Sequence, residues 1–327
     1  MNATHHNITP LGKFKWLLKR EYWENRGGFV WAQVITGGIA ILFAIIGALI
    51  GAFAARNSDG INEIGDVSEY LKVMGAFGDG LLLAGIFLAS LILAFVVFFY
   101  ALGSLYDDRR DRSVLFWKSL PVSDTQTVLS KALWALVLAP LIAMAIGLIV
   151  GLVLWVVAMI GAAAAGATSP WAIATHSHPF RILGLVLSTL PVSLLWALPT
   201  VGWLMFCSAL VRSKPFLWAV LLPLMACTMI SILGAMPGVK LPLGLIWYTV
   251  AYRGLLSVFP SSWLPRGLTD TNIGNDDIQS PADLVQWLLQ HHSLSKVLAD
   301  PDIWIGAVIG IALIVGAVYL RRRRDDI

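Results

Sequence analysis

Charged side chains are scarce in this sequence. Only 13% of its 327 residues are Asp, Glu, Lys or Arg, while 58% are hydrophobic and the mean hydropathy is +0.78. Soluble globular domains contain about 25% charged residues, so this composition excludes that class. The sequence therefore predicts an integral membrane protein.

Cysteine is rare too, and catalytic motifs are missing. Cys207 and Cys227 both lie in apolar runs, which indicates small core residues rather than a disulfide framework or a metal site. The sequence contains neither a G-x-x-x-x-G-K-[ST] phosphate loop nor an H-E-x-x-H motif. We expect a protein that is not an enzyme and binds no cofactor or metal. Energy for any uphill transport would come from another polypeptide.

The main feature of the sequence is a set of long apolar runs. A spanning helix needs at least about 17 predominantly apolar residues, and six runs reach that length: 29–55, 80–105, 133–165, 182–210, 216–233 and 303–320. Their cores lack Asp, Glu, Lys, Arg and His, which disfavours a carrier driven by protons or sodium. We predict an all-α integral membrane protein with six transmembrane helices in one domain, residues 1–327. Pro140 predicts a kink or short break in the third span.

The segment before the first span predicts a helix of its own. Leu11, Phe14, Leu18 and Tyr22 recur at helical spacing within the basic segment Leu11–Arg26. This pattern is typical of an amphipathic helix lying in the membrane interface. A basic stop-transfer flank without such a helix is the alternative.

The region between the fifth and sixth spans, 234–302, is ambiguous by hydropathy. Leu241–Trp263 is nearly apolar enough to cross, but Lys240, Arg253 and two prolines interrupt or bound it. With six spans and a cytoplasmic N-terminus, sixteen Lys and Arg lie inside and seven outside, as the positive-inside rule requires. A seventh span would move the C-terminal arginines outside. We therefore predict an exterior re-entrant or interfacial helical region, with a surface helix at Ser280–Leu298, and both termini in the cytoplasm.

The charged loop 106–131 organises the rest of the chain. Residues 107–112 are all charged, and a charge in the centre of a bilayer costs about 2.5–3.5 kcal/mol or more. The loop must therefore lie in water between the second and third spans.

Through this loop the chain resembles the permease subunits of type-two ABC exporters. The matching residues are Tyr106, Asp108, Arg109, Val114, Leu115, Leu120, Pro121, Val122, Ser123 and Lys131. Arg112 stands where a glycine is common in that family, so the local turn departs from the pattern. The resemblance implies a multi-pass protein of the bacterial plasma (inner) membrane that moves a hydrophobic or amphipathic substrate.

The resemblance also implies the partners. Such permeases work as two identical or related chains with two cytoplasmic ABC ATPase subunits, which bind the ATP and magnesium. The pathway would lie between the two permease halves, lined from the first, second and fifth spans, in contact with membrane lipid. The net charge of +4 comes from the predicted cytoplasmic face, where anionic lipid rather than nucleic acid explains it.

The same resemblance assigns roles within the loop. A short helix would dock into a groove of the ATPase. Its charged residues would orient the contact, and its apolar residues would be buried in the groove. The coupling residues would be Tyr106, Asp108, Arg109, Asp111, Arg112, Val114, Leu115, Phe116, Trp117, Pro121 and Ser123. The alternative is a solvated loop whose arginines only set the orientation of the chain in the membrane.

Glycine pairs and histidines are weaker signals. Gly47/Gly51, Gly147/Gly151 and Gly306/Gly310 are G-x-x-x-G pairs, which permit close helix approach within the chain or between chains. His176, His178, His291 and His292 fall in predicted exterior loops, where solvated histidines are commoner than a metal site. A second functional class stays open: a non-transporting membrane anchor or sensor whose exterior region 234–302 recognises a partner.

Overall fold

The computed structural model describes residues 10–57, 67–111, 122–267 and 294–324. Throughout these ranges the regular structure is helical, with no β-strand. Six helices are long and apolar enough to cross a membrane. The prediction of an all-α membrane protein with six spans is therefore confirmed.

The six long helices correspond one to one with the predicted apolar runs. They are α1–η1–α2 (Pro10–Arg26, Gly27–Trp31, Ala32–Asn57), α3 (Val67–Gly103), α6–η2–α7 (Asp124–Leu133, Trp134–Leu138, Ala139–Ala164), α9 (Pro179–Leu210), η3–α10 (Leu217–Leu221, Leu222–Gly234) and α15 (Pro301–Arg324). The short helices are α4 (Tyr106–Arg110), α8 (Ala172–Thr175), α11 with η4 (Leu243–Trp247, Tyr248–Arg253), α12 (Leu264–Gly267) and α14 (Leu294–Ala299). Each η element is a π-helical turn.

The helix predicted at the N-terminus is present as α1. It joins α2 through the π-helical turn η1 without an intervening loop. Leu17 and Glu21 form its buried side, whereas Trp16 and Trp23 are exposed. The first span is thus the upper part of one long helix whose lower part packs against α6.

Proline shapes the third span without breaking it. Helix runs continuously from Asp124 to Ala164, with the π-helical turn η2 directly before Ala139 and Pro140. Proline has no N–H, and its ring clashes with the carbonyl one turn earlier. A widened turn accommodates both effects, so the predicted disturbance at Pro140 takes the form of a π-turn.

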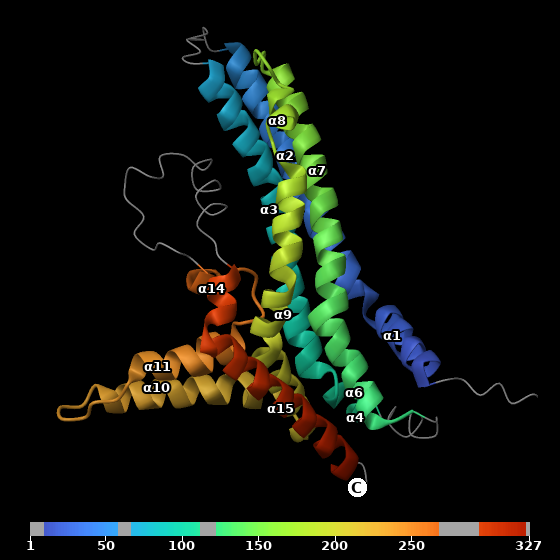
Figure 1. Cartoon of the computed structure of the whole chain (residues 1–327), viewed down its shortest axis with the longest axis vertical. Coiled ribbons are helices and arrows are strands. Elements are labelled where there is room, and N and C mark those ends of the chain that lie inside the picture. The colour runs from blue at the N-terminus through green and yellow to red at the C-terminus, as the bar shows by residue number, and fades with distance from the viewer. Residues whose placement is uncertain (1–9, 58–66, 112–121, 268–293, 325–327) are drawn as a thin grey trace, which may run out of the picture.

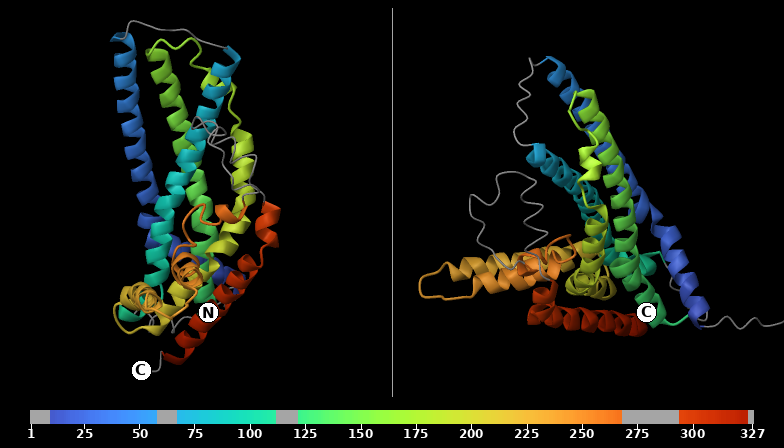
Figure 2. Two further views of the ribbon diagram at one scale, coloured as in Figure 1. Left: turned by 90° about the vertical axis from the view of Figure 1, so that its left-hand side faces the viewer. Right: turned by 45° about the horizontal axis from the view of Figure 1, so that its top comes forward.

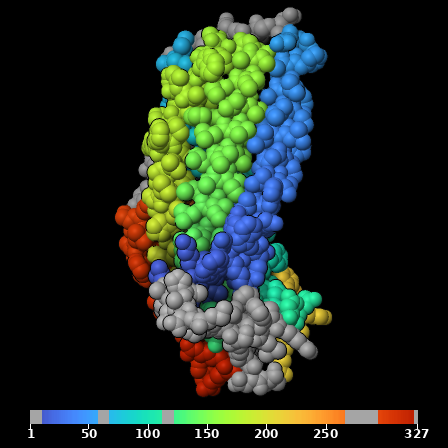
Figure 3. Space-filling view, turned by 90° about the vertical axis from the view of Figure 1, so that its right-hand side faces the viewer, coloured from blue at the N-terminus to red at the C-terminus, as the bar shows by residue number. Residues whose placement is uncertain are grey.

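Close helix contacts depend on glycine at two places. A Cβ on Gly85 of α3 would lie 2.5 Å from the backbone nitrogen of Gly151 on α7. A Cβ on Gly202 of α9 would lie 2.5 Å from the carbonyl oxygen of Gly310 on α15. In contrast, Gly47 on α2 has nothing within 4 Å of a Cβ position. Figure 3 shows α9, α7 and α2 side by side along one face.

The segment after the fifth span folds back on it. Residues 235–242 form the turn, and α11 with η4 then contacts α10, so the two make a helical hairpin that projects sideways from the bundle (Figure 2). The helical part of the predicted Leu241–Trp263 piece ends at Arg253. Most of the predicted surface helix Ser280–Leu298 lies outside the described residues; its end is α14.

The long helices converge at one end, which we call the base. In Figure 1 the base holds α1, α4, α6 and the C-terminal ends of α9 and α15. The opposite end holds the end of α2, the start of α3 and the connection from α7 to α9. The charged loop has two described flanks: α4 with the residues next to it, and the start of α6 with Ser123 before it. Both flanks belong to the base.

Candidate functional site

The first flank of the charged loop is attached to the end of α9. The Ser208 hydroxyl accepts hydrogen bonds from the backbone N–H groups of Leu105 (3.1 Å) and Tyr106 (2.9 Å). The Arg109 guanidinium donates to the carbonyl oxygens of Ser208 and Val211, the latter at 3.0 Å. The last carbonyls of a helix lack partners within it, so Arg109 supplies donors that α9 needs. The start of α4 therefore moves with the end of α9.

Asp108 lies at the centre of an ion-pair network that we call the base network. Its side chain is buried, and its carboxylate lies 3.1 Å from Arg321 Nη1 and 3.5 Å from Lys131 Nζ. Arg20 Nη2 lies 3.9 Å away. These partners come from α15, α6 and α1. One carboxylate at the root of the loop thus joins three other helices.

Glu21 extends the base network into the span region. It is fully buried, with Lys131 Nζ 3.2 Å from its carboxylate. Tyr100 on α3 donates its hydroxyl to the same carboxylate at 2.7 Å. Trp134 anchors the neighbouring turn of α1, donating its indole N–H to the carbonyl of Leu18 at 2.7 Å. Buried charges are tolerated only when they are paired and hydrogen-bonded. Glu21 is paired with Lys131 and accepts hydrogen bonds through Oε2, whereas its Oε1 has the Lys131 ion pair and no hydrogen bond within the described residues.

The second flank of the loop, at the start of α6, also pairs with Arg321. Ser123 caps α6: its hydroxyl accepts from the N–H of Gln126 at 3.3 Å, and the Gln126 side chain accepts from the Ser123 N–H. Asp124, the first residue of α6, lies 3.2 Å from Arg321 Nε. Arg322 donates to the Thr125 hydroxyl at 2.9 Å. Arg321 therefore bridges the two flanks of the charged loop.

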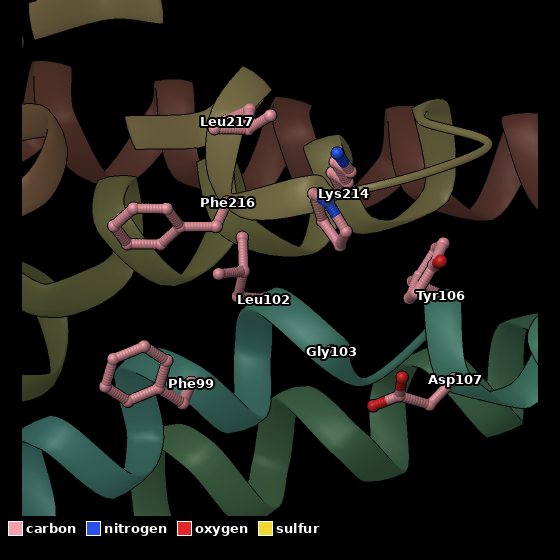
Figure 4. Close-up of a pocket in the computed structure, with 9 residues that line it drawn as sticks. Phe99, Leu102, Gly103, Tyr106, Asp107, Lys214, Phe216 and Leu217 are labelled. Atoms are coloured by element: carbon pink, nitrogen blue, oxygen red, sulfur yellow. The ribbon is translucent and has the colours of Figure 1, made fainter. Parts of the chain in front are cut away.

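A shallow groove of about 530 Å³ lies beside the first flank. Figure 4 shows Phe99, Leu102 and Tyr106 on one side, facing Lys214 and Phe216 on the other. Phe99 is 57% exposed and Phe216 is 45% exposed. The groove thus brings the loop after the second span next to the turn before the fifth.

Asp107 adds a carboxyl group to the groove. It lies beyond the end of α3, outside the spanning segment. Partial burial, together with the nearby Asp111 carboxylate, raises its pKa above the ordinary value. The groove wall is therefore mixed, with aromatic rings, one lysine and one carboxyl.

The structure distributes the predicted coupling residues over several places. Tyr106 lines the groove, Asp111 is exposed at the last described position before the loop, and Ser123 caps α6. Asp108 and Arg109 bond within the chain. Six others lie outside the described residues: Arg112, Val114, Leu115, Phe116, Trp117 and Pro121. Docking of this loop into an ATPase stays a prediction.

Sequence reasoning missed several members of the base network. Glu21, Tyr100 and Arg321 come from segments that were interpreted as an interfacial helix, a span and a topogenic tail. The available signal was a pair of acids, Glu21 and Glu24, within an otherwise basic helix that includes Lys19 and Arg20. The partner of Glu21 on another helix is not visible in the sequence.

A second buried charge lies where the hairpin meets the bundle. Arg253, 5% exposed, stacks its guanidinium 3.8 Å from the ring centre of Trp196 on α9. It also donates to the backbone carbonyl of Asp302 at 3.3 Å, with the Asp302 carboxylate 3.7 Å away. Tyr248 donates its hydroxyl to that carboxylate. This cluster joins η4 to α9 and α15.

The described residues hold no group of three or more metal-ligating side chains. His178 pairs instead with Asp79, whose carboxylate accepts from the His178 backbone N–H at 2.6 Å; His291 and His292 lie outside the described residues. No family model, curated protein or solved structure matches this chain. Function must therefore be argued from the site itself.

Proposed function

We propose that this chain is the membrane-spanning permease subunit of an ATP-driven exporter. A separate cytosolic ATPase would hydrolyse ATP, and this chain would move a hydrophobic or amphipathic substrate. The six spans supply the membrane body, and the missing phosphate loop in the sequence assigns the energy source to a partner. The motif at Tyr106–Lys131 supports the exporter class.

The observation that carries the proposal is the bridge made by Arg321. Its guanidinium pairs with Asp108 in the first flank of the loop and with Asp124 in the second flank. A force applied to the loop would reach α15 through Arg321 and α1 through Lys131 and Glu21. Packed helices joined by buried charges transmit such displacements as rigid elements. The base network is thus suited to pass movement from a docked partner to the spans.

The residues of the loop then divide into two groups. Asp108 and Arg109 act as positioning residues, since their side chains bond within the chain. Tyr106, Asp111 and the residues of 112–121 would meet the ATPase, with Phe116 and Trp117 as apolar anchors. Aromatic anchors carry much of the binding free energy at interfaces, whereas charges confer orientation.

The proposal includes orientation and a second permease chain. The base would face the cytoplasm of a bacterial inner membrane, because it gathers the arginines at the end of α15 and the basic residues of α1. Of the three glycine pairs, Gly147/Gly151 pack on α3 and Gly306/Gly310 on Arg253 and α9. Gly47 and Gly51 have nothing within 4 Å of a Cβ position, which leaves that face of α2 for a partner span.

Purification from native membranes tests the proposal. The tagged chain is extracted in mild detergent, co-purified proteins are identified by mass spectrometry, and ATP hydrolysis and ATP-dependent transport are measured after reconstitution. We expect a phosphate-loop ATPase in stoichiometric amount. Its loss in a Phe116→Ala/Trp117→Ala variant, but not in a matched Trp16→Ala/Trp218→Ala control, would locate the contact. Absence of any ATPase together with absence of ATP-dependent transport would overturn the proposal and favour the anchor or sensor class.

A further inference from the structure

An elongated apolar cavity lies inside the helix bundle. Its volume is about 480 Å³, and its walls are α3, the start of α7 with η2, α9 and residues 257–263. None of the lining residues is Asp, Glu, Lys, Arg or His. Helix α3 packs against both α7 and α9 here (Figure 1). The walls of the cavity thus all come from this chain.

The shape of the cavity favours a linear ligand. The wall on α3 extends from Gly80 to Val97, which is roughly 25 Å of helix at 1.5 Å per residue. A volume of about 480 Å³ spread over that length makes a narrow slot rather than a round chamber. Phe87 in the same wall is 48% exposed, so the slot reaches the lipid-facing surface of the chain beside α3.

Water molecules would be unfavourable in this slot, because they would lack hydrogen-bond partners. At about 30 Å³ per molecule, roughly 16 waters would be needed, each with two to four polar partners. The walls offer only five hydroxyl groups: Ser90, Thr189, Ser193, Ser257 and Ser261. Three of these already bond within the protein: Thr189 to Val186, Ser193 to Trp263 and Ser257 to Thr200. An empty apolar space of this size is also unfavourable, because protein interiors are close-packed.

Residues 256–263, which we call the cover segment, close one side of the slot. The Ser257 hydroxyl lies 2.7 Å from that of Thr200, and the Trp263 indole N–H donates to Ser193 at 3.2 Å. The ring of Phe259 meets Phe95 of α3 edge-on, with ring centres 5.0 Å apart. Ser261, which lines the slot, has a φ of +62°. A non-glycine residue in this region is strained, and such strain gathers at ligand sites.

We propose that the slot binds one extended hydrocarbon chain of a lipid or single-chain amphiphile, held between α3, α9 and the cover segment. The uncharged wall accepts the chain and excludes a charged head group, which stays at the lipid-facing opening. This site stands whether or not the protein is an exporter, since it depends only on the slot.

Photolabelling of the purified full-length chain in lipid nanodiscs tests the site. One probe is palmitate with a diazirine in its chain, and the other is phosphatidylcholine carrying the same modified chain. Crosslinked residues are mapped by mass spectrometry over increasing probe concentration. We expect saturable labelling of wall residues on α3 and α9 by at least one probe. Labelling by palmitate that excess palmitate competes away identifies a single-chain ligand; labelling by phosphatidylcholine alone identifies a bilayer lipid.

Two variants make the test specific. Ser90→Phe fills the slot and should abolish the saturable labelling, whereas Ser188→Phe, on an exposed part of α9 outside the slot, should leave it unchanged. Ala197→Leu replaces Ser90→Phe if the latter no longer elutes as a folded protein. Labelling that rises without saturation, or that persists in the filled variant, would overturn the proposal without bearing on ATPase binding.

Discussion

Asp108 and Arg321, 213 positions apart in the chain, form a buried ion pair with 3.1 Å between the carboxylate and the guanidinium. This pair connects the root of the charged loop to the last span. Removing one partner of a buried pair leaves an uncompensated charge, which costs about 3–5 kcal/mol. A single substitution in this pair should therefore disturb the packing of all the helices that meet in the base.

The first prediction is a double-mutant cycle on this pair. Asp108→Asn and Arg321→Gln should each lower the free energy of unfolding by about 1–3 kcal/mol, less than for an isolated buried pair, because Arg321 keeps Asp124 and Asp108 keeps Lys131 as a partner. The double variant should lose less than the sum, with a coupling energy of about 0.5–3 kcal/mol. Unfolding in a denaturing-detergent titration measures all three, with Asp107→Asn as an exposed control. Strict additivity would show that the pair does not form.

Arg109 gives the second prediction. Arg109→Ala removes a donor from the carbonyls of Ser208 and Val211, and a buried acceptor left without its hydrogen bond costs about 1–3 kcal/mol. We expect faster amide hydrogen exchange in α4 and at the end of α9, with unchanged exchange in α2. Arg110→Ala, at an exposed neighbouring position, is the control. Equal exchange in both variants would contradict the attachment of α4 to α9.

The third prediction concerns the groove shown in Figure 4. If the ATPase contacts Phe216, then Phe216→Ala should weaken its binding by about 2 kcal/mol, or roughly thirtyfold. Trp218 is similarly exposed but does not line the groove, so Trp218→Ala should bind normally. Affinity is measured with purified ATPase and permease in nanodiscs. Normal binding by Phe216→Ala would exclude the groove from the contact.

Helix packing supplies the fourth prediction. A Cβ on Gly147 would lie 2.6 Å from Cα of Ile86, so Gly147→Ala should lower the free energy of unfolding by about 1–3 kcal/mol. Gly47 has open space at that position, and Gly47→Ala should be neutral or stabilising by up to about 1 kcal/mol. Thermal unfolding of the two purified variants compares them directly. Equal stability would mean that α3 and α7 are not in close contact.

The fifth prediction addresses the proposed second copy of the chain. Gly47→Leu/Gly51→Leu places bulky groups on the unoccupied face of α2 and should reduce the dimer fraction in lipid. Gly184→Leu, on a face of α9 with open space, is the matched control. Single-molecule photobleaching in nanodiscs counts the chains. A dimer that survives the α2 change would place the contact on another helix.

Hydropathy and charge alone determined the number of spans and the loop between the second and third, because the cost of burying charge in lipid acts on each segment separately. Composition also fixed the protein class. The ends of the helices are not set by the apolar runs: the second run begins at Gly80, whereas α3 begins at Val67.

Only the tertiary structure decided which charges meet. Asp108 reads in the sequence as one of six charges in a solvated loop, yet its burial against Arg321 and Lys131 depends on α15 and α6 arriving at the same end of the bundle. The same holds for Glu21 beside Tyr100, and for Gly147 packing on α3 while Gly47 packs on nothing. Pairing energies depend on distance, and distances between remote segments arise only when the helices pack.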